Sequence, residues 1–202
     1  MGYGMNNEQN YSGVNVMNKD DIRGGGCEDN PEDCTNLPNE ITVTSVTIED
    51  GQMFAETKNI EINYKTTNDG QSANQPVNKK LAAAFTQTVV EAAIISDITS
   101  LTISSTSNGR DDTGSTSPNH PNGVALDISK INGTSVLFHG ADSPQVQALQ
   151  NSFENRERAR ENFGPSKMLK LGSAYGSDYL RRDHEDHIHF SITSCRKCAR
   201  YS

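Results

Sequence analysis

Three of the five histidines in the sequence lie in the segment HEDHIH, residues 184–189. On an extended strand successive side chains point to opposite faces, so His187 and His189 would face the same side. Ile188 and Phe190 would then enter the core. A solvent-exposed strand edge would carry Lys or Glu instead of clustered imidazoles. We therefore predict that this strand presents histidines to a metal ion.

A second group of metal-binding side chains lies in NHPNGVALD, residues 119–127. Pro121 and Gly123 disfavour a helix here, so we expect His120 on a loop and Asp127 on the following strand. Gly123 would let the chain turn tightly enough to bring the two together. Two neutral imidazoles and one carboxylate form the usual ligand set of a catalytic zinc, which leaves a position for water. An acid beside that water could serve as general base.

The strands that would position these groups are predicted from period-two alternation. Alternating β-branched residues on both sides of Asp50-Gly51 predict a hairpin over residues 41–66. Further strands are predicted at residues 98–107, 124–129 and 188–193.

Two helices are predicted from apolar spacings of three to four residues. The first covers residues 81–96, and its buried face would contain Leu81, Phe85, Val89, Ala92 and Ile95. The second covers residues 144–162, with the basic cluster RERAR on its exposed side. Glu154, Glu157 and Glu161 would pair with that cluster.

Composition divides the chain into two parts. Residues 1–40 are rich in Gly, Asn and acidic residues without apolar periodicity, which indicates a leader or linker. Residues 41–202 would form one domain. The cysteines favour disulfides that tie the N-terminal segment to the C-terminus, and hence an oxidising compartment. Three pairings are open among Cys27, Cys34, Cys195 and Cys198.

The formal charge of −8 argues against a nucleic-acid partner, because such binding depends on Lys and Arg that neutralise phosphates. No run approaches the roughly 18 apolar residues needed to span a bilayer. The first residues, MGYGMNNEQNYSG, show neither a basic nor an apolar region of the kind found in export signals. We expect a protein without a membrane span or an export signal of its own.

The motif HxxGxAxD at residues 120–127, combined with DHIHF at residues 186–190, resembles a known family. The family comprises zinc peptidases of the D-alanyl-D-alanine carboxypeptidase and L-alanyl-D-glutamate endolysin type, which share their fold with the hedgehog signalling domain. The serine that leads the family motif is displaced by one position here, to Ser117. The resemblance covers roughly residues 80–193. It implies an α+β, hedgehog/DD-peptidase-like fold, with an antiparallel sheet and helices packed on one side.

The resemblance also implies roles for individual residues. His120, Asp127 and His189 would bind Zn²⁺. Asp186, three residues before the last ligand, would be the general base, with its neighbour Glu185 as the alternative.

Two further residues are assigned by the same resemblance. Arg110 follows the strand LTISSTS and would bind the substrate or stabilise the oxyanion of the tetrahedral intermediate. His187 would lie beside the metal without being a principal ligand, and would hydrogen-bond the water or the intermediate.

The resemblance implies hydrolysis of the stem peptides of bacterial peptidoglycan. We expect a secreted antibacterial toxin domain or a lysin that acts in the periplasm or cell wall, with an immunity protein as a candidate partner. Two other functions stay open. One is a hedgehog-like binding module that keeps zinc without catalysis, and the other is a metal-dependent nuclease toxin, which the acidic composition disfavours.

Overall fold

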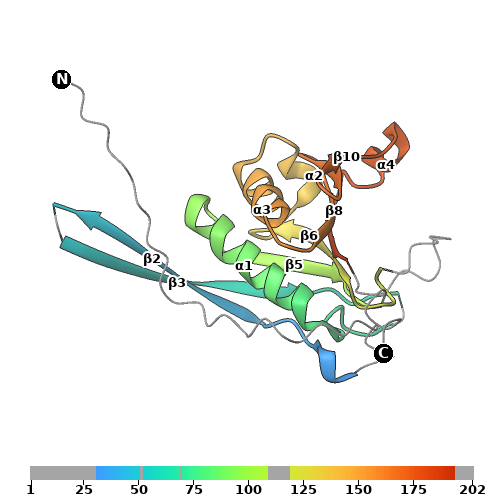
Figure 1. The fold of residues 1–202 in the computed structure, drawn as a ribbon, viewed down its shortest axis with the longest axis horizontal. Coiled ribbons are helices and arrows are strands. Elements are labelled where there is room, and N and C mark those ends of the chain that lie inside the picture. Colours follow the sequence, from blue (N-terminus) through green and yellow to red (C-terminus); the bar gives the residue numbers. More distant parts are fainter. Residues whose placement is uncertain (1–30, 51, 69, 109–118, 194–202) are drawn as a thin grey trace, which may run out of the picture.

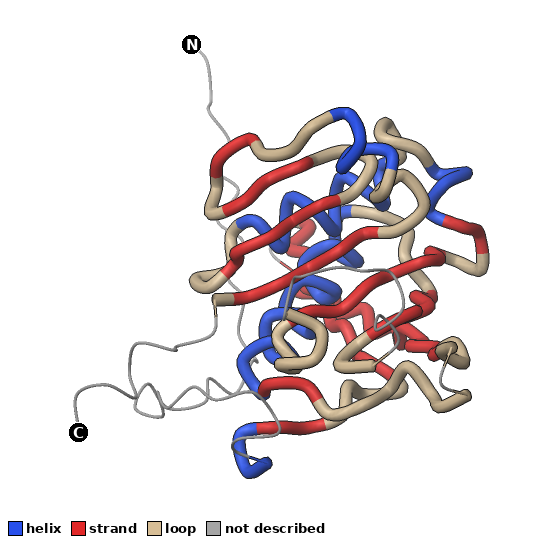
Figure 2. Tube along the Cα trace, turned by 90° about the vertical axis from the view of Figure 1, so that its right-hand side faces the viewer, coloured by secondary structure: helices blue, strands red, loops and turns tan. Residues whose placement is uncertain are grey.

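The computed structural model describes residues 31–50, 52–68, 70–108 and 119–193. Within them, nine strands form the main sheet, which Figure 2 shows in front of the two long helices. In spatial order the strands are β10 (Ser173–Ala174), β9 (Met168–Lys170), β8 (Ala159–Phe163), β11 (Ile188–Ile192), β6 (Ala125–Ile131), β5 (Ser100–Ser105), β3 (Gln52–Tyr64) and β2 (Glu40–Glu49), while β7 (Thr134–Ser135) pairs with β6. The α+β class is confirmed.

The sheet is mixed and mostly antiparallel, which corrects the expectation of a purely antiparallel one. Strands β3 and β5 run parallel, with Glu61 opposite Ser100. The reason is the connection between them, because the chain returns through α1 (Lys79–Ile95), and such a crossover joins parallel strands. The other pairings of the main sheet are antiparallel.

Helix α1 confirms the first predicted helix. It begins after Asn78, whose side chain accepts a hydrogen bond from the backbone N–H of Lys80. Its buried face packs on the sheet and includes Leu81, Phe85, Val89 and Ala92. The expectation for Ile95 was wrong: this side chain is 66% exposed, because the helix ends there.

Helix α3 (Pro144–Glu154) is shorter than predicted. Its Phe153 stacks on Phe190 of β11, with ring centroids 4.0 Å apart, and this contact joins helix to sheet. The prediction that the helix continues to residue 162 was wrong, since residues 159–163 form β8 between β9 and β11. Pairing with two strands outweighs the helical propensity of this charged segment.

The hairpin of β2 and β3 is confirmed, and Figure 1 shows it extending past the end of α1. Its proximal half is anchored in the core by Ile41, Val43, Ile60 and Ile62. Its distal half is exposed and carries the apolar side chains of Val46, Ile48, Met53 and Phe54.

Short elements complete the described structure. They are the 3₁₀ helix η1 (Pro31–Asp33), strands β1 (Cys34–Thr35) and β4 (Val77–Asn78), which pair with each other, and helices α2 (Val136–His139) and α4 (Asp178–Arg182). Leu37 lies in the core. Cys34 is disulfide-bonded, while Cys27, Cys195 and Cys198 fall outside the described residues. Among the described helices none has the length and apolar character needed to cross a membrane.

Candidate metal centre

The structure brings together the three side chains predicted to bind metal. One donor atom from each of His120, Asp127 and His189 lies within 4.8 Å of the other two, and all three residues are buried. His189 Nδ1 is 2.8 Å from Asp127 Oδ1, and His120 Nε2 is 3.4 Å from Asp127 Oδ2. The two imidazole nitrogens are 3.3 Å apart. This group could hold a metal ion.

Two neighbouring strands and one turn position the group. In the antiparallel pair of β6 and β11, Asp127 lies directly opposite His189. Alternation along each strand sends Leu126 and Phe190 to the core beneath the helices, so the two ligands project from the other face. His120 lies in the predicted turn.

The turn at residues 119–123 depends on Gly123. Its φ is +65°, in the left-handed region that favours glycine, and its N–H donates to the carbonyl of His120 at 2.7 Å. The next N–H, that of Val124, donates to the carbonyl of Asn119 at 2.9 Å. The turn therefore returns His120 to the start of β6.

The outward-facing nitrogen of each imidazole has its own oxygen partner. His120 Nδ1 lies 2.5 Å from the carbonyl oxygen of Thr106, and His189 Nε2 lies 3.4 Å from Glu161 Oε2. A proton on each outward nitrogen leaves a lone pair on His120 Nε2 and His189 Nδ1. These are the atoms that converge on Asp127, so the Thr106 carbonyl and the Glu161 carboxylate favour the tautomers that could bind a metal.

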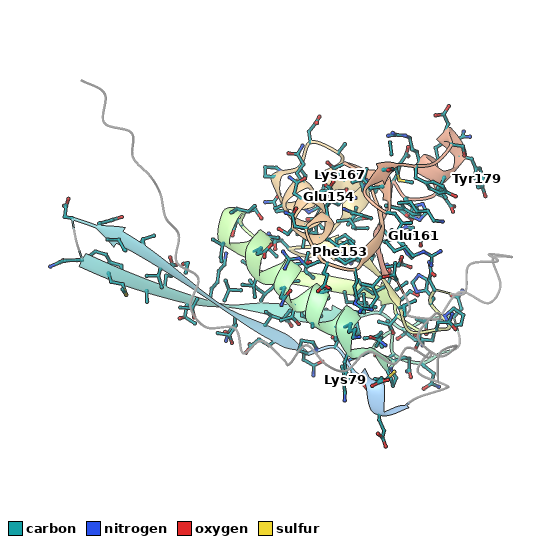
Figure 3. The ribbon with its side chains drawn as sticks, in the orientation of Figure 1. Lys79, Phe153, Glu154, Glu161, Lys167 and Tyr179 are labelled. Carbon is teal, nitrogen blue, oxygen red and sulfur yellow. The ribbon has the colours of Figure 1, made fainter. Side chains whose placement is uncertain are left out.

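Glu161 is the residue of the site that sequence reasoning missed. It is buried on β8 (labelled in Figure 3), next to His189. One carboxylate oxygen accepts hydrogen bonds from Asn119 Nδ2 at 2.5 Å and Ser191 Oγ at 3.0 Å, and the other pairs with Lys170 Nζ at 3.0 Å. In the sequence nothing distinguishes it from the other acids around RERAR, because its burial depends on strand pairing.

The site is electrostatically suited to a cation. Burial raises the pKa of Asp127, but the imidazoles of His120 and His189 outweigh it and hold that pKa well below its usual range. Burial also raises the pKa of Glu161, yet hydrogen bonds from His189 and Lys170 bring it down to about 2. Burial lowers the pKa of His189, but Asp127 and Glu161 raise it to about 8. Both carboxylates are therefore ionised at neutral pH.

These pKa values predict how metal affinity depends on pH. Below about pH 8 a proton on His189 competes with the metal, so the affinity for Zn²⁺ should fall as pH decreases. One displaced proton corresponds to about tenfold per pH unit between roughly pH 7.5 and 6.5. Competition titrations against a chelator of known conditional affinity would measure this slope. An affinity that stays constant over that interval would contradict the raised pKa of His189.

A cleft of about 380 Å³ lies next to the metal ligands. Asp127, Asp186 and His187 line it together, whereas Glu185 is exposed and not among the lining residues. His187 Nδ1 lies 2.7 Å from Asp186 Oδ1, and this hydrogen bond lowers the pKa of Asp186. His187 Nε2 is buried and has no hydrogen-bond partner among the described residues. Arg110 lies outside those residues, so its role stays a prediction.

The remaining histidine of HEDHIH, His184, lies close to the same group. Its ring centroid is 4.8 Å from that of His187 and 5.9 Å from that of His189. Nδ1 bonds the carbonyl of Leu180 at 2.9 Å, and burial lowers the pKa of His184 to about 4. The His184 side chain is therefore uncharged at neutral pH and packs beside His187 and His189.

No protein-family model matches the chain, and neither a curated protein nor a solved structure matches it significantly. The molecule is an α+β protein with a buried His-Asp-His group that could bind a metal.

Proposed function

We propose that this protein is a zinc-dependent peptidase that hydrolyses peptide bonds in the stem peptides of bacterial peptidoglycan. The observation that carries the proposal is the convergence of His120 Nε2, His189 Nδ1 and the Asp127 carboxylate beside a cleft that Asp186 also lines. Two imidazoles, one carboxylate and a nearby acid match the composition of a hydrolytic zinc site. The resemblance of HxxGxAxD and DHIHF to the zinc cell-wall peptidases supplies the substrate class.

In the proposed reaction, different residues of the chain transfer the proton, hydrogen-bond the reacting groups and orient the metal ligands. Bound Zn²⁺ would acidify a water molecule and polarise the scissile carbonyl. Asp186 Oδ would accept the proton of the nucleophile and return it to the leaving amine. His187, with Nδ1 bonded to Asp186, is placed to accept a hydrogen bond at its unpartnered Nε2. Glu161 and the Thr106 carbonyl keep the ligand rings oriented.

The proposed place of action is outside the cytoplasm, in the periplasm or cell wall, as a secreted toxin domain or lysin. The disulfide at Cys34 supports this, because disulfides persist mainly in oxidising compartments. For a toxin domain, an immunity protein in the producing cell is the proposed partner.

Digestion of purified peptidoglycan tests the function. We expect the zinc-loaded protein to release fragments whose masses show one hydrolysed peptide bond per cut, and the fragment masses identify that bond. Chelation should abolish release and added Zn²⁺ should restore it, because the ion that His120, Asp127 and His189 would hold activates the water.

Two results would replace the proposal with another function. Intact muropeptide masses after incubation with a folded, zinc-loaded protein would favour a non-catalytic binding module. Degradation of plasmid DNA by the same preparation with magnesium, without cell-wall cleavage, would favour a nuclease.

A further inference from the structure

The floor of the cleft is formed by β5 and β6, whose pairing is interrupted at two register shifts within residues 102–105. In regular strands consecutive side chains point to opposite faces. Here two consecutive pairs both line the cleft, Ser104 with Ser105 and Ser129 with Lys130. Bulges redirect side chains in this way. They bring hydroxyl groups and an ammonium group onto the face that carries the metal ligands.

Lys130 and Ser135 form the clearest pair of free donors in the cleft. They lie directly opposite each other in the pairing of β6 and β7, and both line the cleft. The side chain of Ser135 makes no capping hydrogen bond to α2, and within the described part of the chain the ammonium of Lys130 has no ion pair. An ammonium and a hydroxyl side by side can donate to the two oxygens of a carboxylate.

Lys65 adds a second positive charge to the same cleft. It follows β3, and its backbone N–H donates to the carbonyl of Ile103 at 2.9 Å, which ties the segment to β5. Its charge also contributes to the lowered pKa of Asp186. Replacement of Lys65 would therefore affect the proposed base Asp186 as well as the binding of a ligand. For this reason Lys130 is the residue chosen for the test.

The charge balance of the cleft depends on the metal. Three carboxylates, from Asp127, Asp183 and Asp186, and two ammonium groups, from Lys65 and Lys130, line it. Their formal sum is −1, and a divalent ion held at Asp127 changes this to +1. The loaded cleft would thus favour an anionic ligand although the whole chain carries −8.

We propose that Lys130 and Ser135, assisted by Lys65, form a subsite for a carboxylate group of the peptide substrate. This inference rests on the proposed peptidase function and names a specificity determinant within it. Lys130 follows Asp127 by three positions on β6, at most roughly 10 Å at about 3.3 Å per residue, because the irregular pairing with β5 lies between them. An extended peptide covers the same length in about three residues. The recognised carboxylate therefore belongs to a residue within about three positions of the scissile bond.

The test compares two stem-peptide probes that differ only in their carboxylates, free in one and converted to primary amides in the other. Binding is measured by calorimetry on the full zinc-loaded chain carrying Asp186→Asn, so that neither probe is consumed. We expect the carboxylate probe to bind about tenfold more tightly, as for one charge-assisted hydrogen bond. Adding Lys130→Met should remove most of this preference, and Lys130→Arg should retain it.

The matched control is Lys79→Met, which removes an exposed lysine at the start of α1 (Figure 3). It should leave the tenfold preference intact. Equal binding of both probes, binding of neither, or a preference that survives Lys130→Met would overturn the subsite. A carboxylate preference in a protein that cleaves no cell wall would instead refute the peptidase and leave the subsite standing.

Discussion

Replacement of Asp186 by Asn should lower the rate of stem-peptide hydrolysis by about 10²- to 10⁴-fold, the range typical for loss of a general base. Asn has the same shape but cannot accept the proton of the nucleophile. Asp186 lines the cleft beside Asp127 and is mostly solvent-exposed, so its replacement should disturb neither the fold nor the ligand group. Zinc content and melting temperature should therefore match those of the wild type.

Glu185→Gln provides the matched comparison. Glu185 directly precedes Asp186 in the chain, and its replacement removes the same negative charge. Its side chain is exposed and does not line the cleft, so hydrolysis should stay near the wild-type rate. Steady-state rates of both variants at one pH and equal zinc occupancy decide between the two acids. A large loss with Glu185→Gln and a small one with Asp186→Asn would reverse the assignment.

Replacement of Glu161 by Gln should weaken zinc binding by about 10- to 100-fold, as is typical for the loss of a residue that orients a metal ligand. The neutral amide would lower the basicity of His189, whose Nε2 faces Glu161. Its NH₂ group would also meet donors already directed at this position, from Asn119 and Lys170. Competition with a chelator measures the affinity directly.

Glu154→Gln is the control for that experiment. Glu154 lies at the end of α3 and forms an ion pair with Lys167 (Figure 3), and among the described interactions its carboxylate has none with His120, Asp127 or His189. The variant should bind zinc like the wild type. If Glu161→Gln also keeps full zinc affinity while its melting temperature falls, Glu161 serves the packing of β8 alone.

The parts of the structure that could be predicted from the sequence are those set by local patterns. Alternation in residues 41–66 predicts the hairpin, and the spacing of apolar residues predicts α1. The candidate metal group could be predicted because His120, Asp127 and His189 combine scarce, chemically specific side chains with turn and strand signals. Strand alternation predicts that Asp127 and His189 each point away from the core, and the pairing of β6 with β11 then places them opposite each other.

What could not be predicted depends on pairing between distant segments. Strand β8 has a sequence that suits a helix, and it is extended because β9 and β11 hydrogen-bond to both its edges. For that reason the sequence predicts Glu161 on the exposed side of a helix, although in the structure it contacts His189. The parallel pairing of β3 with β5 likewise follows from the path of the chain through α1. Neither the extended conformation of β8 nor the parallel pairing of β3 with β5 can be recognised from the residues of those strands alone.

The ligands His120 and His189 are 69 positions apart in the chain, so an ion bound between them closes a long loop. Unlike a disulfide, the ion would leave when the chain unfolds, so its binding free energy would add to the stability of the folded state. At a free zinc concentration of 100 times Kd, the stabilisation would be about 2.7 kcal/mol. The apoprotein would accordingly unfold more easily than the zinc-bound form, in which the ion would hold the turn at His120 against β6 and β11.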